Sequence, residues 1–255
     1  MVRAPRFILI ISGSQILGDT MIRISKTSKL GCHSWSLEAL NTCPAARKQD
    51  GSLVDACKGC YARGGNYRFP NVKAPRIHNK EDWKRDDWVD DMVAELDNHR
   101  YFRWFDSGDM YHIKLAEKIY QVMERTQWVK HWLPTRQYKF SKFADVIERM
   151  NKLDNVIVRL SSDSVQGKKV NFSTFRLNSI KTSSTILPKD IDAVFSSDHD
   201  GVRQDKNAVI CRAYENEGKC GSCRECWNKS VETIAYVAHG RSMAKVINDN
   251  LIAVG

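Results

Sequence analysis

The sequence lacks any apolar run approaching the roughly 20 residues that a membrane-spanning helix requires. The apolar run Phe7–Ile11 follows a basic start but is shorter than the ~7–15 residues of a secretory signal core. We therefore expect a cytoplasmic protein that does not contact a membrane. Phe7–Ile11 favours a buried strand. An alternative interpretation takes Met21 as the natural start and residues 1–20 as an unstructured extension.

Acidic residues are scarce relative to basic ones, with 30 Asp and Glu against 40 Lys and Arg, which gives a formal charge of +10. Such an excess favours a polyanionic partner such as DNA or RNA, although it concerns association and not fold. Internal repeats and low-complexity segments are also absent. A chain of 255 residues is long enough for one α/β barrel with a small appendage, so we expect no second large domain.

Cysteine is missing from the 150 residues between Cys60 and Cys211. The eight cysteines therefore form two sets: Cys32, Cys43, Cys57 and Cys60 near the N-terminus, and Cys211, Cys220, Cys223 and Cys226 near the C-terminus. In a reducing compartment structural disulfides are rare, and grouped thiols more often bind metal. Two sets of four predict two separate metal sites.

The C-terminal set has the more specific spacing. "CGSCREC" reads C-x2-C-x2-C from Cys220 to Cys226, and Cys211 lies upstream across a flexible stretch. Successive three-residue steps wrap thiolates around one corner of a cubane cluster, whereas structural zinc sites tend to use two separated Cys or His pairs. The spacing favours an iron–sulfur cluster, with zinc as the alternative.

The middle of the chain alternates between two kinds of pattern. Apolar residues at helical spacing predict helices over 86–99, 113–126 and 143–153, and strand-like runs cover 101–107, 128–136 and 155–164. Weaker strand signals follow at 170–184 and 191–201. Strands that alternate with helices are typical of βαβ units in a parallel sheet or barrel. We predict an α/β barrel over 21–205, preceded by an extension or edge strand at 1–20 and followed by a Cys-rich segment at 206–255.

Polar residues follow three successive predicted strands, where the working residues of such folds lie. They are Asp106, Ser107, Gly108, Asp109 and His112 after the first strand, Thr135 and Arg136 after the second, and Ser161, Ser162 and Asp163 after the third. Helix caps and loop polar residues are the alternative interpretation of each one. Because all three strands end in polar residues, we expect these residues to converge on one rim of the sheet or barrel.

The order "CKGCYA", "FDSGDMYH", "VKHWLPTRQ" and "NVIVRLSSDS" resembles a family of phage and plasmid gene products of unknown function that carry a radical-SAM-like, partial TIM-type barrel. The resemblance covers roughly residues 30–165, and a similarity to phage gene products extends to the "CGSCRECW" knuckle. It implies that Cys43, Cys57 and Cys60 hold a [4Fe–4S] cluster. It also implies that the turn of Ser107, Gly108 and Asp109, with His112, binds S-adenosylmethionine.

Two departures from the radical SAM pattern concern the cluster ligands. Thirteen residues separate Cys43 from Cys57, where the superfamily usually has three, although such an insertion can loop out without moving the ligands. Cys32 is a candidate fourth ligand or a buried small hydrophobic residue. Three thiolate ligands leave one iron of the cluster free to bind another ligand, whereas four thiolates occupy all four irons. Catalytic and structural zinc sites differ in the same way, since only the catalytic site keeps an open position.

The segment 60–85 interleaves cations with aromatic residues, a mixture suited to unpaired nucleotides. We assign Arg63, Tyr67, Arg68, Lys73 and Arg76 to nucleic-acid contact. The alternative is a loop whose aromatic residues pack over the cluster and whose charges are solvated.

Taken with the resemblance, these patterns predict an iron–sulfur protein of phage or mobile-element origin, located in the host cytoplasm and acting on nucleic acid. If it is a radical SAM-type enzyme, Asp109 holds the cofactor, and Arg136 and Asp163 position the substrate. The alternative function is a non-catalytic binding protein with structural iron–sulfur or zinc sites that targets host nucleic acid or a host protein.

Overall fold

In a computed structural model of the protein, the described residues are 22–168, 170, 181–186 and 208–252. The predicted strand at Phe7–Ile11 and the predicted strand at 191–201 lie outside these ranges.

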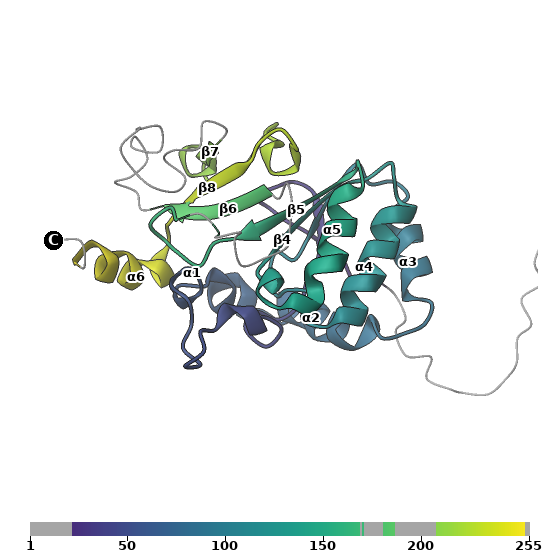
Figure 1. The fold of residues 1–255 in the computed structure, drawn as a ribbon, viewed down its shortest axis with the longest axis horizontal. Helices are drawn as coiled ribbons and strands as arrows, with labels where there is room; N and C mark the ends of the chain where they lie inside the picture. Colours follow the sequence, from purple (N-terminus) through teal and green to yellow (C-terminus); the bar gives the residue numbers. More distant parts are fainter. Residues whose placement is uncertain (1–21, 169, 171–180, 187–207, 253–255) are drawn as a thin grey trace, which may run out of the picture.

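Helices and strands alternate along most of the described chain (Figure 1). The strands are β1 Ser25–Lys26, β2 His33–Trp35, β3 Tyr101–Trp104, β4 Lys130–Thr135, β5 Val156–Ser161, β6 Lys181–Ile186, β7 Ala208–Cys211 and β8 Thr233–Val237. The α-helices are α1 Asp55–Lys58, α2 Pro70–Asp82, α3 Trp88–Glu95, α4 Ile113–Arg125, α5 Ala144–Lys152 and α6 Arg241–Ile252. Short 3-10 helices cover Pro44–Ala46, Tyr61–Arg63, Gly65–Arg68, Gln137–Lys139, Ser141–Phe143, Arg212–Glu215 and Glu225–Trp227.

The eight described strands form one sheet in the order β1-β2-β3-β4-β5-β6-β8-β7. All neighbours pair in parallel except β1, which runs antiparallel to β2. The predicted α/β class is confirmed. The described sheet is not a closed barrel, because β1 and β7 form its two edges and do not pair with each other.

One face of the sheet is covered by α3, α4 and α5, which lie side by side (Figure 1). On α4, the buried residues Leu115, Ala116, Ile119, Val122 and Met123 recur at the spacing of a single helical stripe. They pack with alternate residues of the strands, among them Phe102, Trp104, Val158 and Leu160. This face contains the main hydrophobic core of the described residues.

The opposite face of the sheet packs against the C-terminal segment. Here Trp132 and Ile157, which alternate with the core-facing residues of β4 and β5, contact Cys226 and Trp227. The indole Nε1 of Trp227 donates to the carbonyl of Phe102 at 3.1 Å. The C-terminal segment therefore lies against the central strands of the sheet.

The predicted central helices and strands are confirmed to within a few residues at their ends, as is usual for sequence-based boundaries. Part of the weak strand at 170–184 is also confirmed, as β6. The sequence did not predict α2, in the segment assigned to nucleic-acid contact.

Candidate metal centres

A small hairpin brings the N-terminal cysteines together. Arg47 and Leu53 form an antiparallel bridge, and the amide of Val54 donates to the carbonyl of Ala46 at 3.0 Å. The long insertion between Cys43 and Cys57 therefore turns back on itself. Both cysteines pack in the same small apolar cluster as Ala46 and Val54.

The short helix α1, which carries Cys57, is attached to the end of β5. The amide of Ala56 donates to the carbonyl of Asp163 at 2.9 Å. Cys60 follows directly, and its amide donates to the carbonyl of Cys57 at 3.2 Å. The N-terminal cysteine group, Cys43, Cys57 and Cys60, therefore lies at the carboxyl edge of the sheet, where the polar strand ends were predicted to converge.

Burial and charge act together on these thiols. Burial raises the pKa of Cys43 to about 12, and the neighbouring Asp109 carboxylate, Cys57 and Cys60 add to the rise. Burial also raises the pKa of Cys60, an effect that the charges of Arg136 and Arg63 partly oppose. A bound metal stabilises the thiolate form, because the metal charge offsets the cost of burying the anion.

Arg136 and Asp163 pair with each other beside this group. Arg136 Nε lies 3.3 Å from Asp163 Oδ1, and Arg136 Nη2 donates to the carbonyl of Ser162 at 2.7 Å. Lys139 Nζ makes a second ion pair with Asp163 and donates to the carbonyl of Ala45 at 2.9 Å. The two predicted substrate-positioning residues thus link the ends of β4 and β5 to the cysteine hairpin.

The turn after β3 has internal partners for its polar side chains. Ser107 Oγ accepts from Arg76 Nε and donates to the carbonyl of Leu37, both at 2.7 Å. Gly108 has a φ of +80°, and a Cβ there would lie 2.6 Å from the Cβ of Leu37, so only glycine fits without displacement. His112 accepts from the amide of Lys114 and caps α4.

The Asp109 carboxylate accepts three hydrogen bonds. Its Oδ1 accepts from the Met110 amide at 2.8 Å and from Thr135 Oγ1 at 2.7 Å, and its Oδ2 accepts from the Arg136 amide at 2.9 Å. Burial raises the pKa of this carboxyl, which is only 6% exposed, and the three donors oppose the rise. Asp109 ties the end of β3 to the end of β4.

Arg76 and Tyr67, which the sequence analysis assigned to nucleic-acid contact, have hydrogen-bond partners inside the protein, and the burial of Arg76 counts against its assignment. Arg76 is 5% exposed and pairs with both carboxylate oxygens of Asp106, at 2.9 and 3.0 Å. The Tyr67 hydroxyl donates to Asp106 Oδ2 at 3.2 Å, and its ring contacts both Arg76 and Tyr61. Both side chains fix the segment after Cys60 to the end of β3.

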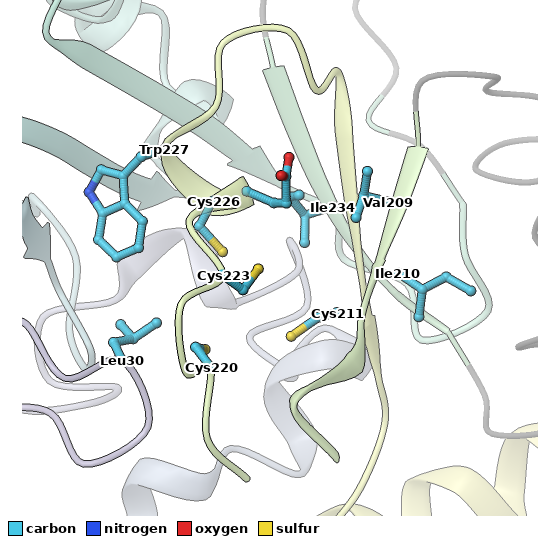
Figure 2. A pocket seen from close by; sticks show the side chains of 10 residues that line it. Leu30, Val209, Ile210, Cys211, Cys220, Cys223, Cys226, Trp227 and Ile234 are labelled. Carbon is cyan, nitrogen blue, oxygen red and sulfur yellow. The ribbon is translucent and has the colours of Figure 1, made fainter. Parts of the chain in front are cut away.

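The C-terminal cysteines line one small cavity of about 30 Å³ (Figure 2). Cys211 comes from the end of β7, and Cys220, Cys223 and Cys226 come from the following loop. Figure 2 shows Cys211, Cys223 and Cys226 directed toward the space between β7 and that loop. Leu30 and Trp227 border the same cavity. All four predicted C-terminal ligands are therefore brought together.

Cys226 is the most buried member of this group. Burial raises its pKa to about 11, and the Tyr236 hydroxyl lies 3.3 Å from its Sγ. Cys32 packs in the same apolar cluster as Cys226 and Trp132, whereas Cys43 and Cys57 pack in a different one. The position of Cys32 therefore favours the interpretation as a small buried hydrophobic residue over that of a fourth ligand for the N-terminal group.

Arg159 fixes the C-terminal cysteine loop, a role that the sequence analysis missed. It is fully buried on β5, within an otherwise apolar strand. Its guanidinium donates to six backbone carbonyls: Thr182, Glu225, Cys226, Asn228, Val231 and Glu232. It thereby holds the loop that carries Cys226. A lone arginine within the apolar run "NVIVRLS" is the signal that could have identified it.

A family model described as Gene product 88 matches residues 13–229, which is well over half of the chain. The chain belongs to the Gene product 88 family. The resemblance to a phage gene-product family is thereby confirmed. No curated protein and no solved structure matches this member of the family.

Two further observations concern metals and membranes. All eight cysteines are free. Within the ranges that the structure describes, no three His, Cys, Asp or Glu side chains are already arranged to hold a metal ion. No helix in those ranges is long and apolar enough to cross a membrane.

Proposed function

We propose that this Gene product 88 family member is an iron–sulfur enzyme of radical-SAM-like type, with an open [4Fe–4S] cluster held by Cys43, Cys57 and Cys60. The observation that carries the proposal is the gathering of these three free thiols at the carboxyl edge of a parallel sheet. That edge is where α/β enzymes bind their ligands. The uninterrupted parallel order β2-β3-β4-β5-β6 supports the likeness to a partial barrel.

The donor set fits a cluster. Three cysteines provide soft thiolate ligands, and burial raises the pKa of Cys43 and of Cys60, so their ionisation is disfavoured unless a metal charge is nearby. When bound, a [4Fe–4S] cluster with three protein ligands supplies an electron and leaves one iron to bind a ligand such as S-adenosylmethionine. Cys32 stays outside this set, because it packs with Cys226 and Trp132.

The residues around the thiols act by positioning. Asp109 orients the backbone of Arg136, and Arg136 pairs with Asp163 beside Cys57. Because both oxygens of Asp109 already accept hydrogen bonds, we assign it to fixing the rim and not to direct contact with the amino group of a cofactor. Ser107 and Gly108 likewise fix the turn after β3. His112 remains exposed at the start of α4.

We further propose that Cys211, Cys220, Cys223 and Cys226 bind a second, closed centre in a C-terminal knuckle. Four thiolates leave no ligand position open, so this centre stabilises the fold and does not bind substrate. The three-residue steps favour iron–sulfur, and zinc is the alternative. The cavity that these four residues line is the supporting observation.

Anaerobic purification followed by iron, sulfide and zinc analysis tests the proposal. One cluster corresponds to about four iron and four sulfide per chain, and two clusters to about twice that. Cys57→Ser should remove the N-terminal cluster and leave the C-terminal centre intact. Cys32→Ala, the matched control at a buried cysteine outside the group, should retain full iron content.

Electron paramagnetic resonance then separates the enzyme from the binding protein. S-adenosylmethionine should change the spectrum of the reduced wild-type and Cys32→Ala clusters. An intact, reducible cluster that is indifferent to S-adenosylmethionine would refute the enzyme and leave the non-catalytic binding protein. A colourless protein with stoichiometric zinc would refute the iron–sulfur assignment altogether.

A further inference from the structure

An exposed basic and apolar surface adjoins the N-terminal cysteine group. It consists of Tyr61, Arg63, Arg68, Phe69, Lys73 and Ile77, which come from the two 3-10 helices after Cys60, from the residue that joins them to α2, and from α2 itself. We name it the 61–77 surface. Three of the six most exposed large hydrophobic residues of the described chain belong to it: Tyr61 and Phe69 at 56% and Ile77 at 47%.

The charge of this surface has one sign. Residues 61–80 contain five lysines and arginines and no aspartate or glutamate. Arg76 is neutralised by Asp106, but Arg63, Arg68 and Lys73 are exposed and form no ion pair with any described residue. Exposed cations elsewhere are often paired, as Arg125 is with Asp90. An unpaired cationic surface attracts a polyanion.

Buried contacts hold the 61–77 surface in one conformation. The Tyr61 hydroxyl donates to the carbonyl of Asp106 while its ring stays exposed. Beneath it, Tyr67 and Arg76 attach the segment to the end of β3. Asn79 of α2 donates to the carbonyls of Arg23 and Ser36, both at 3.0 Å. The exposed aromatic faces are therefore pre-positioned, which lowers the entropic cost of stacking a base on them.

We propose that the 61–77 surface binds single-stranded nucleic acid, with phosphates on Arg63, Arg68 and Lys73 and bases stacked on Tyr61 and Phe69. Cations that follow the backbone and aromatic faces that stack on bases are the two components of sequence-tolerant single-strand binding. Duplex DNA satisfies only the first component, since its bases are already stacked. A protein partner would leave the three unpaired cations without a counterpart unless it were strongly acidic.

This surface connects directly to the cysteine group. Tyr61 follows Cys60 in the chain, and the charge of Arg63 acts on the Cys60 thiol. A strand bound along the 61–77 surface would therefore present a nucleotide beside Cys43, Cys57 and Cys60. This inference rests on the proposed function for its consequence, namely that single-stranded nucleic acid is the substrate class. The binding itself does not depend on the cluster chemistry.

Fluorescence anisotropy with a labelled single-stranded oligonucleotide tests the binding, using full-length protein purified without oxygen. A duplex of the same length and an unlabelled heparin competitor serve as probes for purely electrostatic binding. The double variant Arg68→Glu/Lys73→Glu should weaken single-strand binding at least tenfold and reduce the salt slope by about 1.4, since each lost phosphate contact on a single strand accounts for about 0.7. Phe69→Ala should weaken single-strand binding roughly 5- to 150-fold and leave duplex binding unchanged.

The matched control is Lys114→Glu/Lys152→Glu, which makes the same change in net charge at exposed positions on α4 and α5. It should weaken binding less than threefold. Equal losses in the two double variants, or a Phe69→Ala variant that binds single strands like wild type, would overturn the inference. Iron content is measured on each preparation. Nucleic-acid binding by protein without iron would refute the proposed iron–sulfur enzyme and leave the proposed binding surface standing. An intact cluster in protein that does not bind nucleic acid would refute the binding surface and leave the proposed enzyme standing.

Discussion

The ion pair between Arg76 and Asp106 offers a test of how the segment after Cys60 is fixed to the sheet. The two side chains are 6% and 9% exposed, and Arg76 Nη2 lies 2.9 and 3.0 Å from the two carboxylate oxygens. Removing one partner leaves the other charge buried without compensation, which costs about 3–5 kcal/mol. We expect Arg76→Met and Asp106→Leu each to lower the free energy of unfolding by about that amount.

The double variant Arg76→Met/Asp106→Leu separates a buried charge from lost packing. It removes both charges together and leaves Ser107 and Tyr67 each without one hydrogen bond, a cost of roughly 1–2 kcal/mol in total. Its unfolding free energy should therefore be higher than that of either single variant. The reason is that the desolvation penalty of an unpaired ion is absent when neither ion is present.

Urea unfolding monitored by tryptophan fluorescence, at constant ionic strength and without oxygen, measures these differences. The slope of free energy against urea should be the same in all four proteins, so that midpoints report stability. Purely additive losses, or single variants that cost less than about 1 kcal/mol, would refute the argument that this pair is buried and compensated.

Three further variants test other features of the fold. His131 is fully buried, which lowers its pKa from 6.5 to about 3, so between these pH values only the unfolded chain binds the proton. The free energy of unfolding therefore falls as pH drops, by up to about 1.4 kcal/mol per pH unit. His131→Gln should remove this part of the pH dependence in urea titrations from neutral pH to about pH 5, and an unchanged dependence would count against a neutral histidine. Arg159→Met should destabilise the C-terminal loop by about 3–5 kcal/mol and speed hydrogen exchange across residues 225–237, whereas unaltered protection there would contradict the role of its six carbonyl contacts. Gly59→Ala places a Cβ 2.7 Å from the Cα of Met243, so it should displace α6 or the N-terminal cysteine loop and lower iron retention; wild-type iron content and thermal stability would show that the contact can relax.

Local periodicity was sufficient to predict the central helices and strands. Apolar residues at helical spacing identify α4, because each turn must direct the same stripe toward the core. The apolar residues of β5, interrupted only by Arg159, identify a strand covered on both faces. The two cysteine groups were also visible in the sequence, because thiol ligands must recur at short intervals to reach one centre.

Only the tertiary structure decided which side chains are buried and which are exposed to solvent. Arg76 and Lys73 look alike in the sequence, yet one is buried against Asp106 and the other is exposed, because α2 turns one side toward β3. Cys32 lies closer in the chain to Cys43 than to Cys226, but it packs with Cys226 through long-range folding of the sheet. Arg159 is polar at an apolar position, because five of its six carbonyl partners belong to a segment more than 60 residues away. Sequence spacing constrains contacts within one helix or strand, whereas contacts between distant segments are fixed only when the chain packs into a single sheet.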